Sequence, residues 1–554
     1  MPCLRSRSFR LFILVLTFIC KAASGLADEP AQPQGMYFSK KTYVPAPLPQ
    51  YADIKDRLPS PIYDDNPLWI SIYWKAWELA SRNFHEPKPG SGFVSQFIDA
   101  AFSQNIFLYD SSFMTMFTTF GAPLVPGIST LDNFYAKQEP DGEIEREYIR
   151  DTGKYYDPWV NHEGRSLFSR DGWTDGVVSY HTDFTYRGRT PPNPNPIFTL
   201  DALDHPILAW AEIESYRVTG DRNRLAMVWE PLVHYYAALQ KYLRQGNGLY
   251  VTDWASMDNS PRNPYLKGGG TGVDISSEMV LFARNLAEIA GILGKDSESK
   301  QYSRDAEALS ATIRQRMWNK HRNFYFDLTL DDQYAPVKTI AAYWTLVAHV
   351  ASARQARYLV SELRNPKTFG RPSGVPTLAA DEPLYDPEGG YWKGSVWAPT
   401  ETMVIRGLSA YGYHDLARQL AIEHLNLVAD VYQKTGTIWE NYAPDEPTHG
   451  RLSKPDFVGW SGIGPILYLI EYAIGLRPDA AHNQLFWELR SGGRRGCERF
   501  RFNGHVVSLI AKPDDTNRLH ISVESDGEFS LKVQRGRTSK TFRIKKGQQE
   551  LTIQ

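Results

Sequence analysis

The chain has 554 residues, of which 42% are hydrophobic and 22% charged, and its formal net charge is −2. This composition is typical of a globular protein and excludes a disordered one, and the length allows a large core plus a small second module. The near-zero charge and the lack of a long basic run argue against nucleic acid as the main partner.

Residues 1–27 have the features of an export signal. A basic segment, MPCLRSRSFR, precedes the apolar LFILVLTFIC, and Gly25 and Ala27 follow at the spacing that a signal peptidase reads. The apolar run is short for a membrane span, so we expect cleavage and export to the periplasm or the medium, without stable membrane insertion. Cys20 has no small residue before it, which disfavours lipoprotein processing. Cleavage would leave Cys497 as the single cysteine, without an internal disulfide.

Residues 28–65 are rich in Pro and Tyr and predict an extended N-terminal arm lying over the body. From about residue 66 to 475 the dominant apolar period is helical, and we expect a helical domain at 66–485. In RNRLAMVWEPLVHYYAALQKYL, Leu225 begins an apolar stripe at three- and four-residue steps, which Pro231 interrupts. Gly294, after LAEIAGIL, is a helix-stop signal.

The predicted helices come in pairs, and similar aromatic segments separate the pairs. These segments are NGLYVTDWASMDNS, RNFYFDLTLDD, GGYWKGSVWAPT and TGTIWENYAPDE. Each opens on a small or polar turn residue and contains at least two aromatic residues. Helical hairpins repeated around a closed ring would bring all these loops to one end of the ring.

Residues 490–554 change the pattern to alternating apolar and polar residues. Turn signals at Asn503-Gly504, Asp514–Asn517, Asp526-Gly527 and Lys546-Gly547 separate short runs. This pattern predicts a small antiparallel β-sheet or sandwich domain. No set of catalytic residue types occurs in it, so we expect a packing or accessory role.

Aromatic residues make up 13% of the chain, and such rings either fill a core or stack on sugars. Hydrolysis of a glycosidic bond needs one protonated carboxyl and one carboxylate. Three acids lie in aromatic, turn-rich segments: Asp110 in NIFLYDSSFM, Asp258 in ASMDNSPR and Glu440 in GTIWENYAPDE. Each has a simpler interpretation when taken alone, namely a helix cap for Asp110, a turn cluster for Asp258 and an exposed loop acid for Glu440.

Together and in this order, the segments resemble those of inverting α-glycosidases built on an (α/α)6 barrel. The likeness is to the family 63 α-glucosidases and the mannosylglycerate and glucosylglycerate hydrolase-like group, and more distantly to trehalases. It covers about residues 66–475 and is carried by YDSSFM, MDNSPR, YWKGSVW, IWENYAP and VGWSG. The resemblance implies a mainly α fold, an (α/α)6 barrel with the small C-terminal antiparallel β domain appended.

The same resemblance implies roles for individual residues. MDNSPR matches the loop of the general acid, which gives that role to Asp258, and IWENYAP gives the role of general base to Glu440. The predicted substrate-binding positions are Tyr109, Asp110, Trp254, Arg262, Trp392, Trp397 and Trp460; Trp254 is included because it lies near Asp258 in the sequence and could make the pocket apolar. For Arg262 the contact would be with the sugar or with a carboxylate.

The chain departs from the family pattern at two positions near the expected sugar. Tyr109 replaces the usual Trp before the aspartate, and Lys393 replaces Arg in the YWRG stretch. A long aromatic insertion also follows the first motif, with His181, Asp183, Tyr186 and Arg187 close together. This insertion, at about 157–196, either builds the leaving-group side of the pocket or caps the barrel, and we favour the former. Arg187 and Lys267 offer basic groups for an acidic aglycone.

The sequence therefore predicts an exported glycoside hydrolase that cleaves an α-linked hexoside, such as an α-glucoside, with inversion. Its partner would be an oligosaccharide or a small glycoside, without a cofactor or metal, because no His pair at ligand spacing accompanies the acid segments. Two alternatives stay open: a carbohydrate-binding protein on the same barrel without catalysis, and a polysaccharide lyase with a Tyr or His base.

Overall fold

The computed structural model describes residues 34–154, 205–252, 257–266, 270–490, 492–514 and 518–553. The predicted signal peptide, the insertion at 157–196, Trp254 and Lys267 lie outside the described residues.

Helices make up most of the described chain between residues 67 and 474. The longer ones are α2 (Pro67–Ser81), α3 (Leu108–Thr118), α6 (Leu208–Thr219), α7 (Arg222–Leu243), α9 (Val273–Leu293), α10 (Asp296–Arg316), α12 (Ala353–Leu363), α13 (Ala398–Ala410) and α14 (His414–Thr435). Shorter ones are α1 (Tyr51–Ile54), α4 (Asp132–Ala136), α8 (Asn263–Leu266) and α11 (Trp344–Val347), and a π-helical segment spans Ile463–Ile474. The sequence signals agree: α7 continues through Pro231, and Gly294 ends α9 in the left-handed conformation with φ of 79°.

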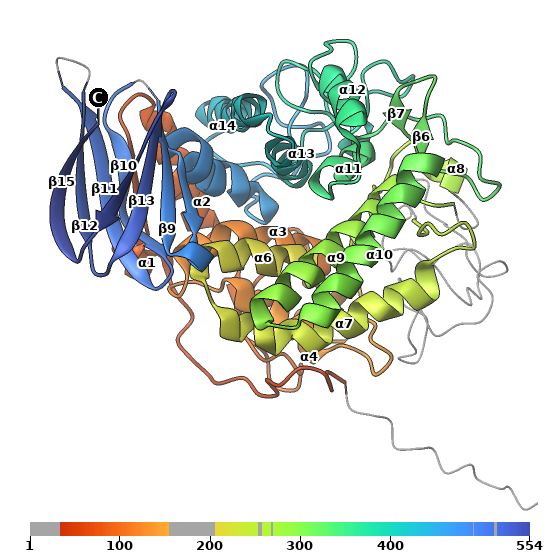
Figure 1. The fold of residues 1–554 in the computed structure, drawn as a ribbon, viewed down its shortest axis with the longest axis horizontal. Helices are drawn as coiled ribbons and strands as arrows, with labels where there is room; N and C mark the ends of the chain where they lie inside the picture. Colours follow the sequence, from red (N-terminus) through yellow and green to blue (C-terminus); the bar gives the residue numbers. More distant parts are fainter. Residues whose placement is uncertain are drawn as a thin grey trace, which may run out of the picture.

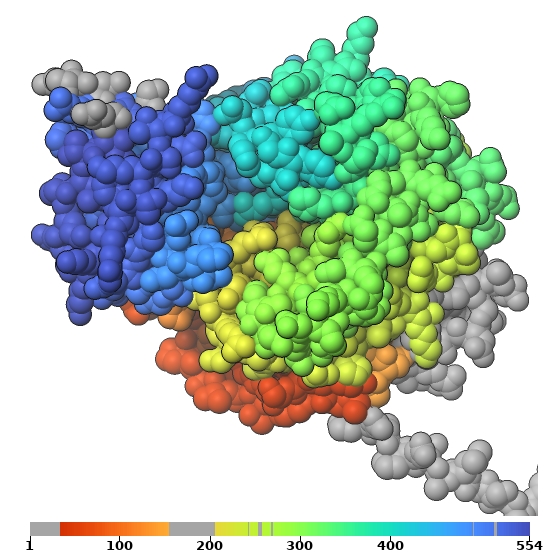
Figure 2. Space-filling model, viewed as in Figure 1, coloured from red at the N-terminus to blue at the C-terminus, as the bar shows by residue number. Residues whose placement is uncertain are grey.

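Consecutive helices pack against each other in pairs, as the sequence pattern predicts (Figure 1). Helix α9 packs on α10, and α13 packs on α14. Helix α14 and helix α2 both contact the π-helical segment, and α3 contacts α6. On the face seen in Figure 2, the surface is hollowed between α6 and α9 on one side and α13 and α14 on the other. Within the described residues, none of the helices combines the length and apolar character needed to cross a membrane.

The C-terminal strands form two sheets on one side of the helices (Figure 1). Their strands are β8 (Leu476–Asp479), β9 (Gln484–Leu489), β10 (Arg495–Phe502), β11 (His505–Pro513), β12 (Leu519–Ser525), β13 (Phe529–Arg535), β14 (Thr538–Ile544) and β15 (Gly547–Ile553). One sheet has the order β1-β10-β11-β12-β15 and the other β14-β13-β9-β8. All neighbours pair antiparallel except β9 and β13, which are parallel.

Strand β1 (Ser60–Tyr63) is contributed by the N-terminal segment and pairs with β10 at the far end of the chain. Strands β8 and β9 lie before residue 490, where the sequence predicts the β region to begin. The β region therefore contains one strand from before the helices, β1, and the remaining strands from after them. Alternation fixes which face of each strand is buried, because neighbouring side chains point to opposite faces. In β9, the sequence QLFWEL buries every second side chain. Cys497 in β10 is a buried free thiol, and burial raises its pKa.

In the described residues, three two-stranded sheets lie among the helices. They pair β2 (Phe84–His85) with β3 (Phe97–Ile98), β4 (Asn105–Phe107) with β5 (Glu147–Ile149), and β6 (Trp318–Asn319) with β7 (Phe324–Tyr325). Strand β4 leads directly into α3. The first turn of α3 therefore holds Tyr109 and Asp110 at the end of a small sheet.

Candidate active site

The segment 257–266 contains Asp258 and consists of an irregular stretch, 257–262, followed by the short helix α8. Asp258 is buried, with 5% of its surface exposed. The Asn263 side chain donates hydrogen bonds to the carbonyls of Met257 and Asp258, each at 3.0 Å. These bonds tie the irregular residues Met257 and Asp258 to the start of α8. We refer to residues 257–266 as the acid loop.

Arg262 fastens the acid loop to the start of α9. Its guanidinium lies 2.5 Å from Asp274 and 3.3 Å from Asp327, and all three side chains are at most 2% exposed. Burial works against the charge, but the two carboxylates outweigh it and raise the pKa of Arg262. Of the two contacts expected for Arg262, sugar or carboxylate, the structure shows carboxylates. Arg262 is thus fully buried against two carboxylates, and its assignment to substrate binding stays a prediction.

His205 connects α3 with α9, at Glu278, which follows Asp274 by about one helical turn. Its ring lies 4.6 Å from the Tyr109 ring, and its Nδ1 lies 2.5 Å from the Glu278 carboxylate on α9. Burial would raise the pKa of Asp274, but Arg262 and then His205 outweigh it, and the pKa is lowered. The start of α9 therefore holds two buried acids, Asp274 facing Arg262 of the acid loop and Glu278 facing His205.

Glu440 is buried, with 2% of its surface exposed, and its backbone is held on both sides. Its N–H donates to the carbonyl of Lys454 at 2.9 Å, and its carbonyl accepts from the Trp460 indole at 3.1 Å. The Tyr391 hydroxyl donates to Glu440 Oε1 at 3.2 Å. The side chain is therefore a fixed carboxylate rather than the exposed loop acid that the simpler interpretation of the sequence suggests.

The three predicted tryptophans of the pocket wall are neighbours. The Trp392 and Trp397 rings are stacked with centroids 5.2 Å apart and 14° between planes, and Trp397 lies 5.6 Å from Trp460. Trp397 and Trp460 are buried, whereas Trp392 is partly exposed. Phe457 and Phe102 extend the cluster, at 4.8 and 5.9 Å from Trp460. These rings form an aromatic cluster next to Glu440, whose carbonyl accepts from the Trp460 indole.

Backbone and side-chain bonds join the segments that contain the two acids. The Asn259 amide donates to the Gly390 carbonyl at 3.2 Å and accepts from the Trp392 N–H at 2.9 Å. Val396 and Tyr442 exchange two backbone hydrogen bonds, at 2.8 and 3.0 Å. The YWKGSVW segment thus contacts the acid loop at one end and the segment of Glu440 at the other.

Helix α3 completes this arrangement. Asp110 lies inside its first turn, 6% exposed, while Phe107 is the N-cap residue, so Asp110 is not the cap that the simpler interpretation gives. Helix α3 packs against the turn Trp460–Gly462. The contacts therefore form a closed circuit through the acid loop, Gly390–Trp392, Glu440, Trp460, α3, His205, Glu278 and Asp274 on α9, and Arg262. Each predicted residue in the described chain belongs to this circuit or touches it.

Several members of the circuit were not singled out from the sequence. Asn259 and Tyr391 lie inside quoted motifs, but nothing in their type distinguishes a bridging amide or phenol. Asp274 and Glu278 carry a stronger signal, because acids are rare on the buried face of an apolar helix such as GVDISSEMVLF. Asp327 lies in RNFYFDLTLDD, one of the recurring aromatic segments. His205 has no neighbouring motif that would have identified it.

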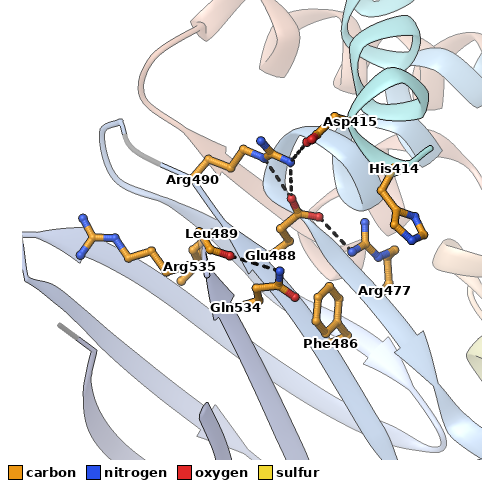
Figure 3. Close-up of a pocket in the computed structure, with 10 residues that line it drawn as sticks. His414, Asp415, Arg477, Phe486, Glu488, Leu489, Arg490, Gln534 and Arg535 are labelled. Carbon is orange, nitrogen blue, oxygen red and sulfur yellow. Dashed lines mark hydrogen bonds and ion pairs between the residues drawn. The ribbon is translucent and has the colours of Figure 1, made fainter. Parts of the chain in front are cut away.

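A pocket of about 720 Å3 lies away from this circuit, between α14 and strands β8, β9 and β13. Figure 3 shows that charged side chains line it and pair with one another. Arg490 binds Asp415 at 2.8 Å and Glu488 at 2.6 Å, and Arg477 binds Glu488 at 3.0 Å. None of the predicted site residues lines it. Because Arg477 and Arg490 are already paired, we interpret the pocket as a junction between the β region and α14.

A search of the described residues finds no group of three or more His, Cys, Asp or Glu side chains arranged to hold a metal ion.

Comparison with known proteins identifies relatives of the chain. The family model for the mannosylglycerate hydrolase MGH1-like glycoside hydrolase domain matches residues 156–461. A mannosylglycerate hydrolase of Thermus thermophilus is 23% identical over 373 residues, 65% of this chain and 83% of that protein. A probable mannosyl-oligosaccharide glucosidase of Schizosaccharomyces pombe is 24% identical, and a periplasmic trehalase of Xanthomonas oryzae is 28% identical. Each of these two matches covers 38% of this chain, but only 28% and 36% of the relative.

Solved structures share the fold. The crystal structure of a GH63 mannosylglycerate hydrolase from Thermus thermophilus in complex with glucose superposes with a TM-score of 0.51 and 20% identity, covering 71% of this chain and 98% of that chain. A sialidase structure superposes with a TM-score of 0.61 and 13% identity, covering 92% of this chain and 42% of that chain. At these identities the likeness concerns the fold alone.

Proposed function

The chain belongs to the mannosylglycerate hydrolase MGH1-like glycoside hydrolases, and from this premise we propose that it hydrolyses an α-linked hexoside with inversion. Asp258 would be the general acid and Glu440 the general base. The observation that carries the proposal is the closed circuit of contacts. Contacts join segments far apart in the sequence, from Tyr109 to Trp460, with the two separate loops that hold the buried acids Asp258 and Glu440, and aromatic rings lie beside Glu440.

The proposed chemistry assigns one proton transfer to each acid. Asp258 gives its proton to the glycosidic oxygen as the bond to the anomeric carbon breaks. Glu440 takes a proton from a water that attacks the opposite face of the same carbon. Inversion requires roughly 6.5–9.5 Å between the two carboxyl groups, so that the water fits between base and sugar. The hydrogen bond from Tyr391 to Glu440 Oε1 orients the carboxylate that would receive this proton.

The remaining site residues receive proposed roles in substrate binding. Asp110, in the first turn of α3, would accept hydrogen bonds from sugar hydroxyls, with Tyr109 beside it. Trp392, Trp397 and Trp460 would form the apolar wall against the sugar ring. Arg262 would act indirectly, because its ion pairs with Asp274 and Asp327 hold the acid loop in place.

We also propose that the helical pairs between residues 66 and 485 close into an (α/α)6 barrel. The packing of α9 on α10 and of α13 on α14 supports this, as does the likeness to the GH63 structure. Export through a cleaved signal at 1–27 is proposed from the sequence, and similarity to periplasmic trehalases agrees with it. Tyr109 and Lys393 differ from the family pattern near the expected sugar. We therefore propose no single sugar configuration, and gluco-, galacto- and manno-configured substrates are to be compared directly.

The test is hydrolysis of 4-nitrophenyl and disaccharide α-glucosides, α-galactosides and α-mannosides, with the released anomer followed by NMR. We expect one configuration to be cleaved with the β-anomer appearing first. Glu440→Gln should abolish turnover on every substrate, because a neutral amide cannot take the proton from water. Asp258→Asn should abolish turnover on disaccharides but retain more of it on 2,4-dinitrophenyl glycosides, whose leaving group needs no proton.

Glu446→Gln is the matched control, since Glu446 is an exposed acid in the same loop as Glu440. It should behave as the wild type does. Wild-type turnover in Glu440→Gln or Asp258→Asn would contradict the assignment of these residues. Release of the α-anomer first would contradict inversion, and an unsaturated product absorbing in the ultraviolet would identify a lyase instead.

A further inference from the structure

Three consecutive residues, Gly390 to Trp392, span the distance between the acid loop and Glu440. At one end they exchange two hydrogen bonds with the Asn259 side chain, at 3.2 and 2.9 Å. At the other end the Tyr391 hydroxyl donates to Glu440 Oε1 at 3.2 Å. Asn259 directly follows Asp258 in the chain. A short connection of covalent and hydrogen bonds therefore runs from the backbone of one buried acid to the carboxylate of the other.

The middle of this connection has an unusual backbone conformation. Tyr391 has a φ of 65°, in the left-handed region that residues other than glycine rarely adopt. Such residues persist where the surroundings hold them, and they cluster at functional sites. Here the Tyr391 carbonyl accepts from the Ser395 N–H at 2.9 Å and from the Thr377 hydroxyl at 3.3 Å. The Tyr391 ring is buried and packs edge-on against Trp397 at 4.7 Å.

At this turn the Tyr391 side chain reaches Glu440, while the backbone N–H of the next residue, Trp392, faces Asn259. Other supports act on one side only. Asn263 ties the acid loop to itself, and the Trp460 indole holds the carbonyl of Glu440.

We propose that Asn259 and Tyr391 are positioning residues that together set the separation between the general acid and the general base. This inference rests on the proposed function of Asp258 and Glu440. An inverting site must keep both carboxyl groups at a distance that admits one water beside the sugar. A displacement of about 1 Å from the reactive geometry costs on the order of 100-fold in rate. The bridge through Gly390–Trp392 restrains this distance without contributing a proton of its own.

The test compares N259A, Y391F and the double variant in the whole protein, on the glycoside from the panel above that is hydrolysed. We expect each single variant to lower kcat by about 10- to 100-fold with KM changed less than about threefold, because the loss is in the alignment of the reacting groups. The double variant should lose less than the product of the two single losses, because either change alone already opens the bridge.

Y391F should also change the pH profile. A hydrogen bond donated to the ionised carboxylate favours that form, so its removal should move the acid limb of the kcat/KM profile to higher pH. Y343F is the matched control. Tyr343 is a fully buried tyrosine whose hydroxyl donates to the Leu359 carbonyl at 3.2 Å, outside the circuit. Y343F should keep the wild-type kcat and the wild-type acid limb.

The outcomes distinguish failure of the proposed bridge from failure of the proposed function. If Glu440→Gln and Asp258→Asn are inactive but Y391F matches Y343F in kcat and pH profile, the bridge is overturned and the proposed function stands. Losses in N259A and Y391F that multiply in the double variant would also overturn it, because they would show independent roles. Full turnover in Glu440→Gln would overturn the function itself. If N259A does not fold, N259S replaces it in the cycle, and Y391F alone still decides on its kcat and pH profile.

Discussion

Two arginines that each bind two carboxylates hold different regions of this protein together. Arg262 binds Asp274 and Asp327 behind the acid loop, with all three side chains at most 2% exposed. Arg490 binds Asp415 and Glu488 where the β region meets α14, with Arg490 41% and Asp415 90% exposed (Figure 3). The distances are similar, between 2.5 and 3.3 Å.

The difference between the two regions lies in solvent. Water screens the charges of Arg490 and Asp415, so breaking the cluster leaves these two groups hydrated, while Glu488 keeps its ion pair with Arg477. The charges around Arg262 have no such alternative, and removing one member would leave the others buried and uncompensated. The helical region therefore contains an ionic cluster next to the candidate site whose charges are costly to desolvate. The β region is instead stabilised by alternating buried apolar side chains, such as those of β9.

The largest expected effect comes from breaking the buried cluster. Arg262→Met should lower the free energy of unfolding by about 3–5 kcal/mol, because Asp274 and Asp327 would stay buried without a cation. Thermal and urea unfolding of the variant would measure this loss. The triple variant R262M/D274N/D327N should recover part of it, because no net charge remains buried. A triple variant less stable than R262M would contradict the explanation.

The next effect on stability is expected at Glu401, a buried carboxyl group in α13. Burial raises the pKa of Glu401 to about 8, while the Val375 N–H donates to it at 2.6 Å. The folded state therefore keeps a proton that the unfolded state releases above the ordinary value of 4.5. The stability from Glu401 is complete below pH 4.5 and is lost as the pH rises to about 8, by roughly 3–5 kcal/mol in total.

Glu401→Gln should flatten this dependence, because the amide has no proton to lose. Melting temperatures of both proteins between pH 4.5 and 9 would show the variant gaining on the wild type toward the alkaline end. Glu446→Gln, at an exposed position, should leave the curve unchanged. Parallel curves for Glu401→Gln and the wild type would show that Glu401 is ionised in the folded protein throughout this range.

The smallest effect is expected at the exposed cluster. Arg490→Met, the same substitution as at Arg262, should change the free energy of unfolding by less than about 1 kcal/mol, and less still at high salt. Urea unfolding at low and high ionic strength measures it. A loss as large as that of Arg262→Met would mean that burial is not what separates the two regions.

The sequence by itself determined the helical region, the β region and the order of the motifs. Local signals suffice for these, because helix periodicity, strand alternation and turn residues act over a few neighbouring positions. The stop at Gly294 and the turns at Asn503-Gly504, Asp526-Gly527 and Lys546-Gly547 lie where the local pattern places them. The family also followed from motif residues in order, and the match over 156–461 confirms it.

Only the tertiary structure decided which groups meet. The entry of β1 into the C-terminal sheet and the contact of Tyr109 with His205 join segments that no local pattern connects. Arg262 shows the physical reason most clearly. An arginine four positions after an acid has the same sequence signature whether it faces a sugar or a carboxylate. Its burial and its partners, contributed by α9 and by Asp327, determine which of the two it does.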